Sequence, residues 1–175
     1  SIKGVAFGNN TFVAVGSSGT IVRSTDNGSS FDNVTSPTSA GFHGIAFGNN
    51  TFVAVSYEGQ IVRSTDNGSS FDNATSPTTG EINGIAFGNN IFVASGPDGT
   101  PSRSTDNGSS FDNVTTSVNR AIKGVAFGSG IFVGVGNQGT IIRSTDNGSN
   151  WDNATSSLQS IPDPPGPPSL AAITF

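Results

Sequence analysis

The sequence contains no cysteine and no methionine, and only 11% of its 175 residues are charged. Without thiols, disulfide, thiolate–metal and thiol redox chemistry are excluded. Seven Lys and Arg residues stand against 12 Asp and Glu residues, a formal net charge of −5, so no basic patch is present to neutralise phosphates and we expect no nucleic-acid partner. No apolar run approaches the ~20 residues of a membrane span, so no membrane insertion is expected either.

Residues that commonly carry catalysis or hold metals are scarce. His43 is the only histidine and Tyr57 the only tyrosine. We expect His43 to lie in a loop, without a zinc or triad role. The turn Asp26-Asn27-Gly28 lacks the alternating ligands of a calcium loop. The sequence therefore predicts no cofactor, no metal site and no enzyme activity.

Small polar residues dominate instead, with 24 glycines and many Ser, Thr and Asn residues. Such a surface, poor in lysine, is typical of an extracellular or cell-surface protein, and that location is our expectation. The chain begins at Ser1, so we expect either a processed product that has lost a signal peptide or a piece of a longer protein.

One eight-residue stretch, Ser24 to Phe31, returns every 40 residues with the form S-x-D-x-G-x-x-[F/W]. The Asp carboxylate can accept hydrogen bonds from backbone N–H groups just ahead of it, Gly28 can adopt φ > 0, and Phe31 can bury a large ring. We call this stretch the clasp. Its defining residues are Ser24, Asp26, Gly28, Phe31, Ser64, Asp66, Gly68, Phe71, Ser104, Asp106, Gly108, Phe111, Ser144, Asp146, Gly148 and Trp151.

The clasp resembles the Asp-box, or bacterial neuraminidase repeat, and the resemblance covers residues 1–160. It departs from the family at Ser30, where Thr is usual. The resemblance implies that each clasp joins the third and fourth strands of a β-propeller blade. The tandem pattern is also similar to repeats of bacterial and phage surface proteins and of photosystem assembly factors, which implies a scaffold or adhesin.

The repeats predict an all-β protein, a β-propeller of four four-stranded antiparallel blades, at about 1–40, 41–80, 81–120 and 121–160. In the first repeat we expect strands at Ile2–Phe7, Thr11–Val15, Thr20–Ser24 and Phe31–Thr35. The first two are apolar on both faces, so both faces should be covered by neighbouring blades. A β-solenoid is the alternative fold.

Two segments break the pattern. Pro101 and Ser102 should shorten or bulge the third strand of the third repeat, because proline cannot donate to the ladder. Residues 161–168 form a Pro-rich spacer, and residues 169–175 match the first strand of a repeat. This extra C-terminal strand could be donated to another chain, giving a self-assembling filament through Leu170, Ile173 and Phe175.

The repeats diverge mainly in the turn between the second and third strands and in the connection between blades. In a propeller these loops lie on one face, opposite the clasps. The candidate binding residues there are Tyr57, Glu58, Asp98, Asn119 and Arg120.

Together these features predict a non-catalytic extracellular module for binding or assembly, whose partner is itself, a surface protein or a glycan. A carbohydrate-binding lectin is the alternative, and a sialidase-like glycoside hydrolase comes third. Arg23, Arg63, Arg103 and Arg143 occupy equivalent positions, one per blade, so they should stabilise the blades, pairing with Asp32, Asp72, Asp112 and Asp152, rather than converge on a substrate.

Overall fold

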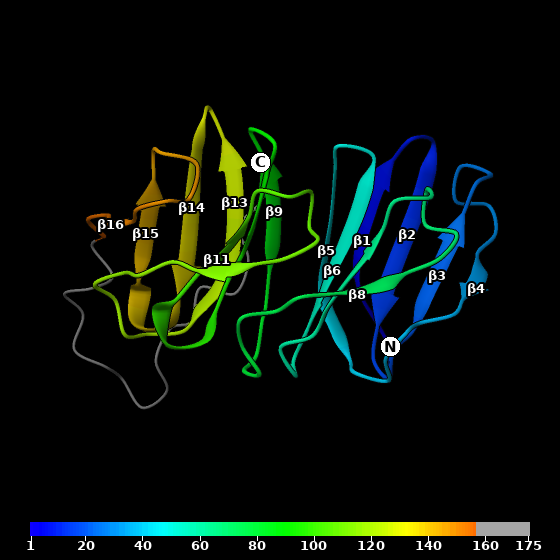
Figure 1. Cartoon of the computed structure of the whole chain (residues 1–175), viewed down its shortest axis with the longest axis horizontal. Coiled ribbons are helices and arrows are strands. Elements are labelled where there is room, and N and C mark those ends of the chain that lie inside the picture. The colour runs from blue at the N-terminus through cyan, green and yellow to red at the C-terminus, as the bar shows by residue number, and fades with distance from the viewer. Residues whose placement is uncertain (157–175) are drawn as a thin grey trace.

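The computed structural model describes residues 1–156, which form four four-stranded antiparallel sheets with strands in sequence order (Figure 1). The first sheet comprises β1 (Ile2–Gly8), β2 (Thr11–Gly16), β3 (Ile21–Ser24) and β4 (Asp32–Val34). The second comprises β5 (Phe42–Gly48), β6 (Thr51–Ser56), β7 (Ile61–Ser64) and β8 (Asp72–Ala74). The all-β, four-blade prediction is confirmed.

The third sheet is the irregular one. It comprises β9 (Ile85–Gly88), β10 (Ile91–Ala94), β11 (Ser102–Ser104) and β12 (Asp112–Asn113). Its strand β11 has three residues where β3 and β7 have four, which confirms the expected effect of Pro101 and Ser102. The fourth sheet comprises β13 (Ile122–Gly128), β14 (Ile131–Gly136), β15 (Ile141–Ser144) and β16 (Asp152–Asn153).

Helical structure is limited to two single 3₁₀ turns, η1 (Pro97–Gly99) and η2 (Asn137–Gly139), within residues 1–156. Both lie between the second and third strands of a blade. No helix in this part of the chain has the length and apolar character that crossing a membrane requires.

The cores lie between blades. One cluster joins the second and third strands of the first blade to the second blade, through Val13, Val15 and Ile21 on one side and Phe42, Phe52 and Phe71 on the other. Equivalent clusters join the second blade to the third and the third to the fourth. The middle strands β6 and β10 are buried along their whole length, as the apolar runs predicted.

A phenylalanine and a glycine interlock at each junction. A Cβ added to Gly8 would lie 2.1 Å from the Phe47 ring, and the same is true of Gly48 with Phe87 and of Gly88 with Phe127. Real Cβ atoms do not come so close to a ring, so the phenylalanine of each blade occupies space that only a glycine in the preceding blade leaves free.

The four blades form an arc. Each blade contacts its sequence neighbours, and within residues 1–156 no fourth core cluster joins the last blade to the first. Figure 1 shows the first and last sheets at opposite ends of the long axis, with the inner strands β1, β5, β9 and β13 between them. Ile2, Val5 and Phe7 on the outer face of β1 are therefore 52%, 60% and 53% exposed.

We predict that Gly48→Ala lowers the free energy of unfolding by about 1–3 kcal/mol, because the new methyl group must displace the Phe87 ring. Urea denaturation followed by circular dichroism measures the loss. Gly41→Ala is the matched control, because its new Cβ would meet nothing closer than 3.7 Å. Equal midpoints for the two variants would refute the interlock.

Candidate functional site

The first clasp is held together by its own side chains. Ser24 Oγ donates to Asp26 Oδ1 at 2.7 Å and accepts from the Gly28 backbone N–H at 2.9 Å. Asp26 also accepts from the Ser30 backbone N–H at 3.0 Å and from the Ser30 hydroxyl at 2.6 Å. Asn27 and Gly28 both have positive φ, at 60° and 82°. The turn is therefore built as the sequence indicated, with Asn27 as a second left-handed position.

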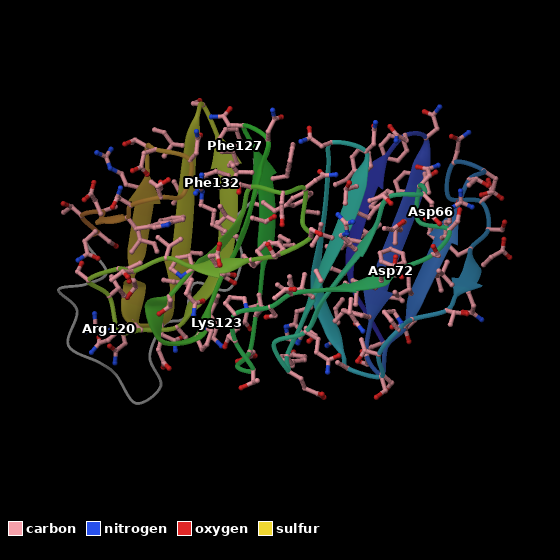
Figure 2. The ribbon with its side chains drawn as sticks, viewed as in Figure 1. Asp66, Asp72, Arg120, Lys123, Phe127 and Phe132 are labelled. Atoms are coloured by element: carbon pink, nitrogen blue, oxygen red, sulfur yellow. The ribbon has the colours of Figure 1, made fainter. Side chains whose placement is uncertain are left out.

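The other three clasps repeat these bonds, and the hydrogen-bonded carboxylates become stronger acids. Hydrogen bonds from Ser30, and a further one from Ser24, hold the pKa of Asp26 well below its usual range. Partial burial raises the pKa of Asp66, but hydrogen bonds from Ser70, Ser64 and Ser69 outweigh it and lower the pKa to about 2. Asp66 lies within its clasp, while Asp72 lies on β8 beyond it (Figure 2).

The second, third and fourth clasps also bond to the blade that precedes each of them. Arg23 Nε donates to the Asn67 carbonyl at 2.8 Å, and Asn67 Nδ2 donates to Thr11 Oγ1 at 2.7 Å. Arg63 and Arg103 donate in the same way to the carbonyls of Asn107 and Asn147. The expected Arg–Asp pairs within each blade are therefore wrong. Lys123–Glu81, at 3.1 Å, is the one ion pair among the described residues.

The prediction that Phe31 is buried is also wrong. Its counterparts Phe71, Phe111 and Trp151 are 5%, 2% and 7% exposed, whereas Phe31 is 43% exposed. The counterparts pack against the blade that precedes them, and within the described residues no blade precedes the first. Trp151, expected to be a core residue, is one, and its Nε1 donates to the Gly148 carbonyl at 3.1 Å.

The divergent loops meet at the end of the strands opposite the clasps, which we call the turn face. The Tyr57 N–H donates to the Gly41 carbonyl at 3.1 Å, and the Ile122 N–H donates to the Gly96 carbonyl at 3.2 Å. Each bond ties a turn between the second and third strands to a connection between blades.

The candidate binding residues belong to these loops. Tyr57 and Glu58 lie in the turn after β6, Asp98 in η1, and Asn119 and Arg120 in the connection before β13. Figure 2 shows Arg120 and Lys123 near the lower edge of the molecule and Phe127 near its upper edge. Glu58 also lines a groove of about 440 Å³ that includes Pro37, Thr38, Gln60 and Thr79.

The sequence analysis missed a cluster at the inner edge of the turn face. It comprises Lys3, His43, Asn83 and Lys123, which are 40 residues apart and immediately precede Gly4, Gly44, Gly84 and Gly124, together with Glu81. In β1, β5 and β13 the pairing register shifts at this position. Such a β-bulge interrupts the alternation of side chains between the two faces of the strand. We call these five residues the inner-edge cluster.

The prediction that His43 lies in a loop is wrong, because His43 is half-buried in strand β5. Its ring lies next to the ring of Tyr57. Burial is the main reason that the pKa of His43 falls to about 4; Glu81 opposes the fall, and the charges of Lys3 and Lys123 add to it. His43 is therefore neutral at pH 7. His43 Nε2 and Asn83 Nδ2 are buried without a hydrogen-bond partner.

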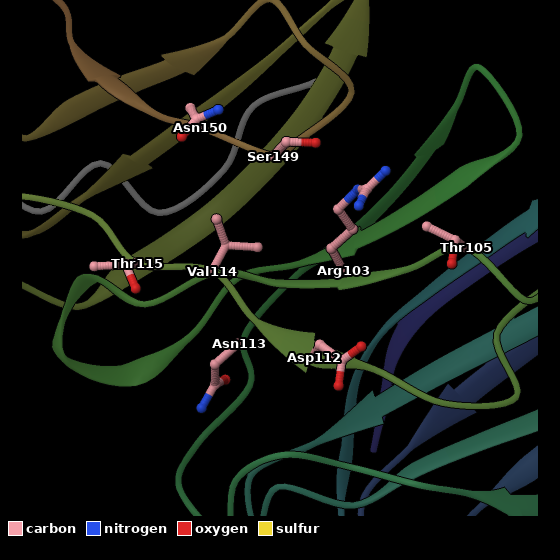
Figure 3. A pocket seen from close by; sticks show the side chains of 8 residues that line it. All are labelled: Arg103, Thr105, Asp112, Asn113, Val114, Thr115, Ser149 and Asn150. Atoms are coloured by element: carbon pink, nitrogen blue, oxygen red, sulfur yellow. The ribbon is translucent and has the colours of Figure 1, made fainter.

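A second groove lies at the junction of the third and fourth blades (Figure 3). It has a volume of about 370 Å³, and Arg103, Asp112, Ser149 and Asn150 line it. Because Arg103 already donates to Asn147 in the clasp of the fourth blade, this groove is part of a blade junction.

Residues 1–156 contain no group of three or more potential metal ligands. Some predicted features lie beyond the described residues. The Pro-rich spacer at 161–168, the strand expected at 169–175 and the assembly residues Leu170, Ile173 and Phe175 lie outside the described residues.

The sequence matches no family model and no curated protein. Solved structures do resemble it. YCF48 bound to D1 peptide aligns over 90% of this chain and 53% of its own, with 19% identity and a TM-score of 0.67. The computationally designed Ika4 protein aligns over 82% of this chain and 90% of its own, with 19% identity and a TM-score of 0.66. An ancestral GH74 enzyme aligns over 89% of this chain and 24% of its own, with 22% identity and a TM-score of 0.73.

The chain thus spans about half of the YCF48 chain and a quarter of the GH74 chain. At these identities the likeness establishes the fold alone, and that fold is a β-propeller.

We predict that Asp66→Ala lowers stability by ~1 kcal/mol at pH 7, because its carboxylate accepts several hydrogen bonds in the clasp. The melting temperature should fall by roughly 2–4 °C. Asp72→Ala is the control, since the Asp72 side chain accepts no hydrogen bond within residues 1–156. An equal loss in the two variants would show that the clasp bonds contribute nothing.

The same carboxylate makes stability depend on pH. Folding lowers the pKa of Asp66. Its contribution to the free energy of unfolding is therefore complete above the unfolded pKa of 3.8 and is lost as the pH falls toward about 2. The difference in melting temperature between Asp66→Ala and the unmodified chain should therefore shrink between pH 4 and pH 2. A constant difference across that range would contradict the shifted pKa.

We predict that His43 titrates near pH 4 and not near its ordinary 6.5. Because the chain has one histidine, a single imidazole resonance in the NMR spectrum reports it directly. Glu81→Gln should move the midpoint lower still, and Glu58→Gln, on the same face, should leave it unchanged. A midpoint near 6.5 would show that the ring is solvated.

Proposed function

We propose that the chain is a non-catalytic β-propeller module that binds a carboxylate-bearing ligand at the inner-edge cluster of its turn face. One observation carries the proposal. The inner strands of the four blades are nearly identical from the glycine onward, but the residue just before that glycine is Lys, His, Asn and Lys in turn. A uniform scaffold therefore holds polar side chains of three different kinds at four equivalent positions near its centre.

Most of these side chains are donors. Lys3 is exposed, Asn83 Nδ2 is buried without a partner, and a neutral His43 can donate from Nε2 in one of its tautomers. Buried polar groups are normally paired, so partnerless donors indicate a ligand or a water molecule that completes them. An anion with two acceptor oxygens, such as a carboxylate, suits an ammonium group beside amide and imidazole N–H groups.

The surrounding surface can extend the contact. Tyr57 is 45% exposed and lies next to His43, so it can offer an aromatic side to the ligand. The nearby groove that Glu58 lines gives room for a larger molecule. A peptide is compatible with this fold, since the similar YCF48 structure is described as bound to D1 peptide.

The clasp geometry and its 40-residue repeat also support identification as an Asp-box protein, and the lack of convergence among the arginines supports a non-catalytic role. Arg23, Arg63 and Arg103 each donate to a carbonyl of a separate clasp. They are therefore committed to three different junctions and are not gathered around one substrate. An extracellular or cell-surface location remains our prediction from composition.

Calorimetric titration with two matched pairs of probes tests the proposal. The first pair is a short peptide with a free C-terminal carboxylate and its C-terminal amide, and the second is sialyllactose and lactose. We predict that the carboxylated member of one pair binds at least about tenfold more tightly than its neutral partner. The pair that shows the difference identifies a peptide or a glycan as the source.

Variants locate the site. Lys3→Gln should remove most of the preference for the carboxylate, because it removes the exposed charge of the cluster. Arg120→Gln is the matched control, since it removes the same charge from the same face outside the cluster. Equal binding of charged and neutral probes would refute the ligand chemistry, and hydrolysis of a fluorogenic sialoside would refute the non-catalytic role.

A further inference from the structure

The first blade exposes a surface that every other blade buries. Ile2, Val5, Phe7 and Phe31 are between 43% and 60% exposed, and no other large hydrophobic residue in the described part of the chain is so exposed except Tyr57. At equivalent positions, Phe42 is 0% exposed and Phe71 is 5% exposed. We call the four exposed residues the head surface.

The repeats show what covers such a surface. In the second blade, Phe47 fills the space over Gly8, Phe71 joins a core with Val13, Val15 and Ile21, and Asn67 accepts from Arg23. The second junction repeats all three contacts, and the third repeats them with Ser95 and Pro101 in place of Val15 and Ile21. The complement of a head surface is thus the following face of another blade of the same kind.

The last blade carries that complement, which we call the tail surface. Gly128 corresponds to Gly8, Val133, Val135 and Ile141 to Val13, Val15 and Ile21, and Arg143 to Arg23. Unlike Arg23, Arg63 and Arg103, Arg143 is exposed and makes no hydrogen bond within residues 1–156. Val133 is only half buried, whereas Val13, Val53 and Val93 are fully buried.

We propose that the head surface of one chain binds the tail surface of a second copy, and that two such contacts close a ring of eight blades. In each contact Phe7 lies over Gly128 of the other copy, Phe31 joins Val133, Val135 and Ile141, and Arg143 donates to the Asn27 carbonyl. The bond that Asn67 donates to Thr11 recurs at the second junction but not at the third, where Ile91 replaces the threonine. Ile131 stands at this position in the last blade, so the Asn27 side chain likewise lacks that acceptor.

The arc favours two copies over an open chain of copies. The first and last sheets lie on opposite sides of the inner strands, at the two ends of the long axis (Figure 1). A second copy, rotated by a half-turn about an axis parallel to the inner strands, places its last sheet beside the first sheet of the original. Its first sheet then lies beside the last sheet of the original. Both contacts then form at once, so the assembly closes and does not grow.

Multi-angle light scattering on the full 175-residue chain tests the ring. We expect a mass of about 35 kDa, twice the 17.6 kDa of one chain, without larger species as the concentration rises. A mass of one chain at all concentrations would mean that the head surface of one copy does not bind the tail surface of another. A distribution of ever longer species would mean a filament. Either result overturns the proposal.

Two variants address the two surfaces. Val5→Asp buries a carboxylate at the head surface and should raise the dimer dissociation constant by roughly 100-fold or more. Arg143→Glu should raise it by about tenfold, because it removes the donor to Asn27 from an exposed position at which folding is not at risk. Tyr57→Asp and Arg120→Glu are the matched controls and should leave the dimer intact.

Mixing the variants tests the direction of the contact. A Val5→Asp chain with an Arg143→Glu chain places both changes in one junction and leaves the other unmodified, so a mixed dimer should be more stable than the Val5→Asp dimer, in which both junctions are modified. Circular dichroism confirms that each variant is folded. Unchanged dimerisation in Arg143→Glu, or a mixed dimer as weak as the Val5→Asp dimer, would rule out head-to-tail closure.

Discussion

The structure depends on an interaction between blades and not within them. Each phenylalanine at the end of an inner strand lies over a glycine of the preceding blade, and the arginine and clasp of neighbouring blades bond across the same junction. A single blade is a thin sheet that cannot cover either of its own apolar faces. Stability in such an array comes from nearest neighbours, so the loss of one contact weakens two blades.

The parts of this architecture that are local could be predicted from sequence. The clasp is built by Ser24, Asp26, Gly28 and Ser30 within seven residues, so the residue types alone indicate its bonds and its positive φ. The four-strand blade follows from turn signals and the 40-residue period. The short strand β11 follows from Pro101, because a missing N–H acts wherever the residue stands.

The parts that depend on residues far apart in the sequence could not be predicted from it. The acceptor of Arg23 is a carbonyl 44 residues away, and an Asp on the adjacent strand was the nearer candidate. Phe31 has the same local sequence as Phe71, yet it differs in exposure because its environment is set by another blade. The inner-edge cluster could not be predicted because the sequence does not indicate a register shift. Without that shift, Lys3, His43, Asn83 and Lys123 have the pattern of ordinary strand residues.

The near identity of the blades has a consequence for folding kinetics. Residues 4–43 and 44–83 are the same at 29 of 40 positions, so a strand of one repeat can pair with a partner from another repeat at little cost in energy. Such mispairing is a characteristic trap of repeat proteins. The third repeat, with Pro101 and Ser102 in β11, forms a poorer ladder with any wrong partner. Its irregularity therefore marks one position along an otherwise uniform chain.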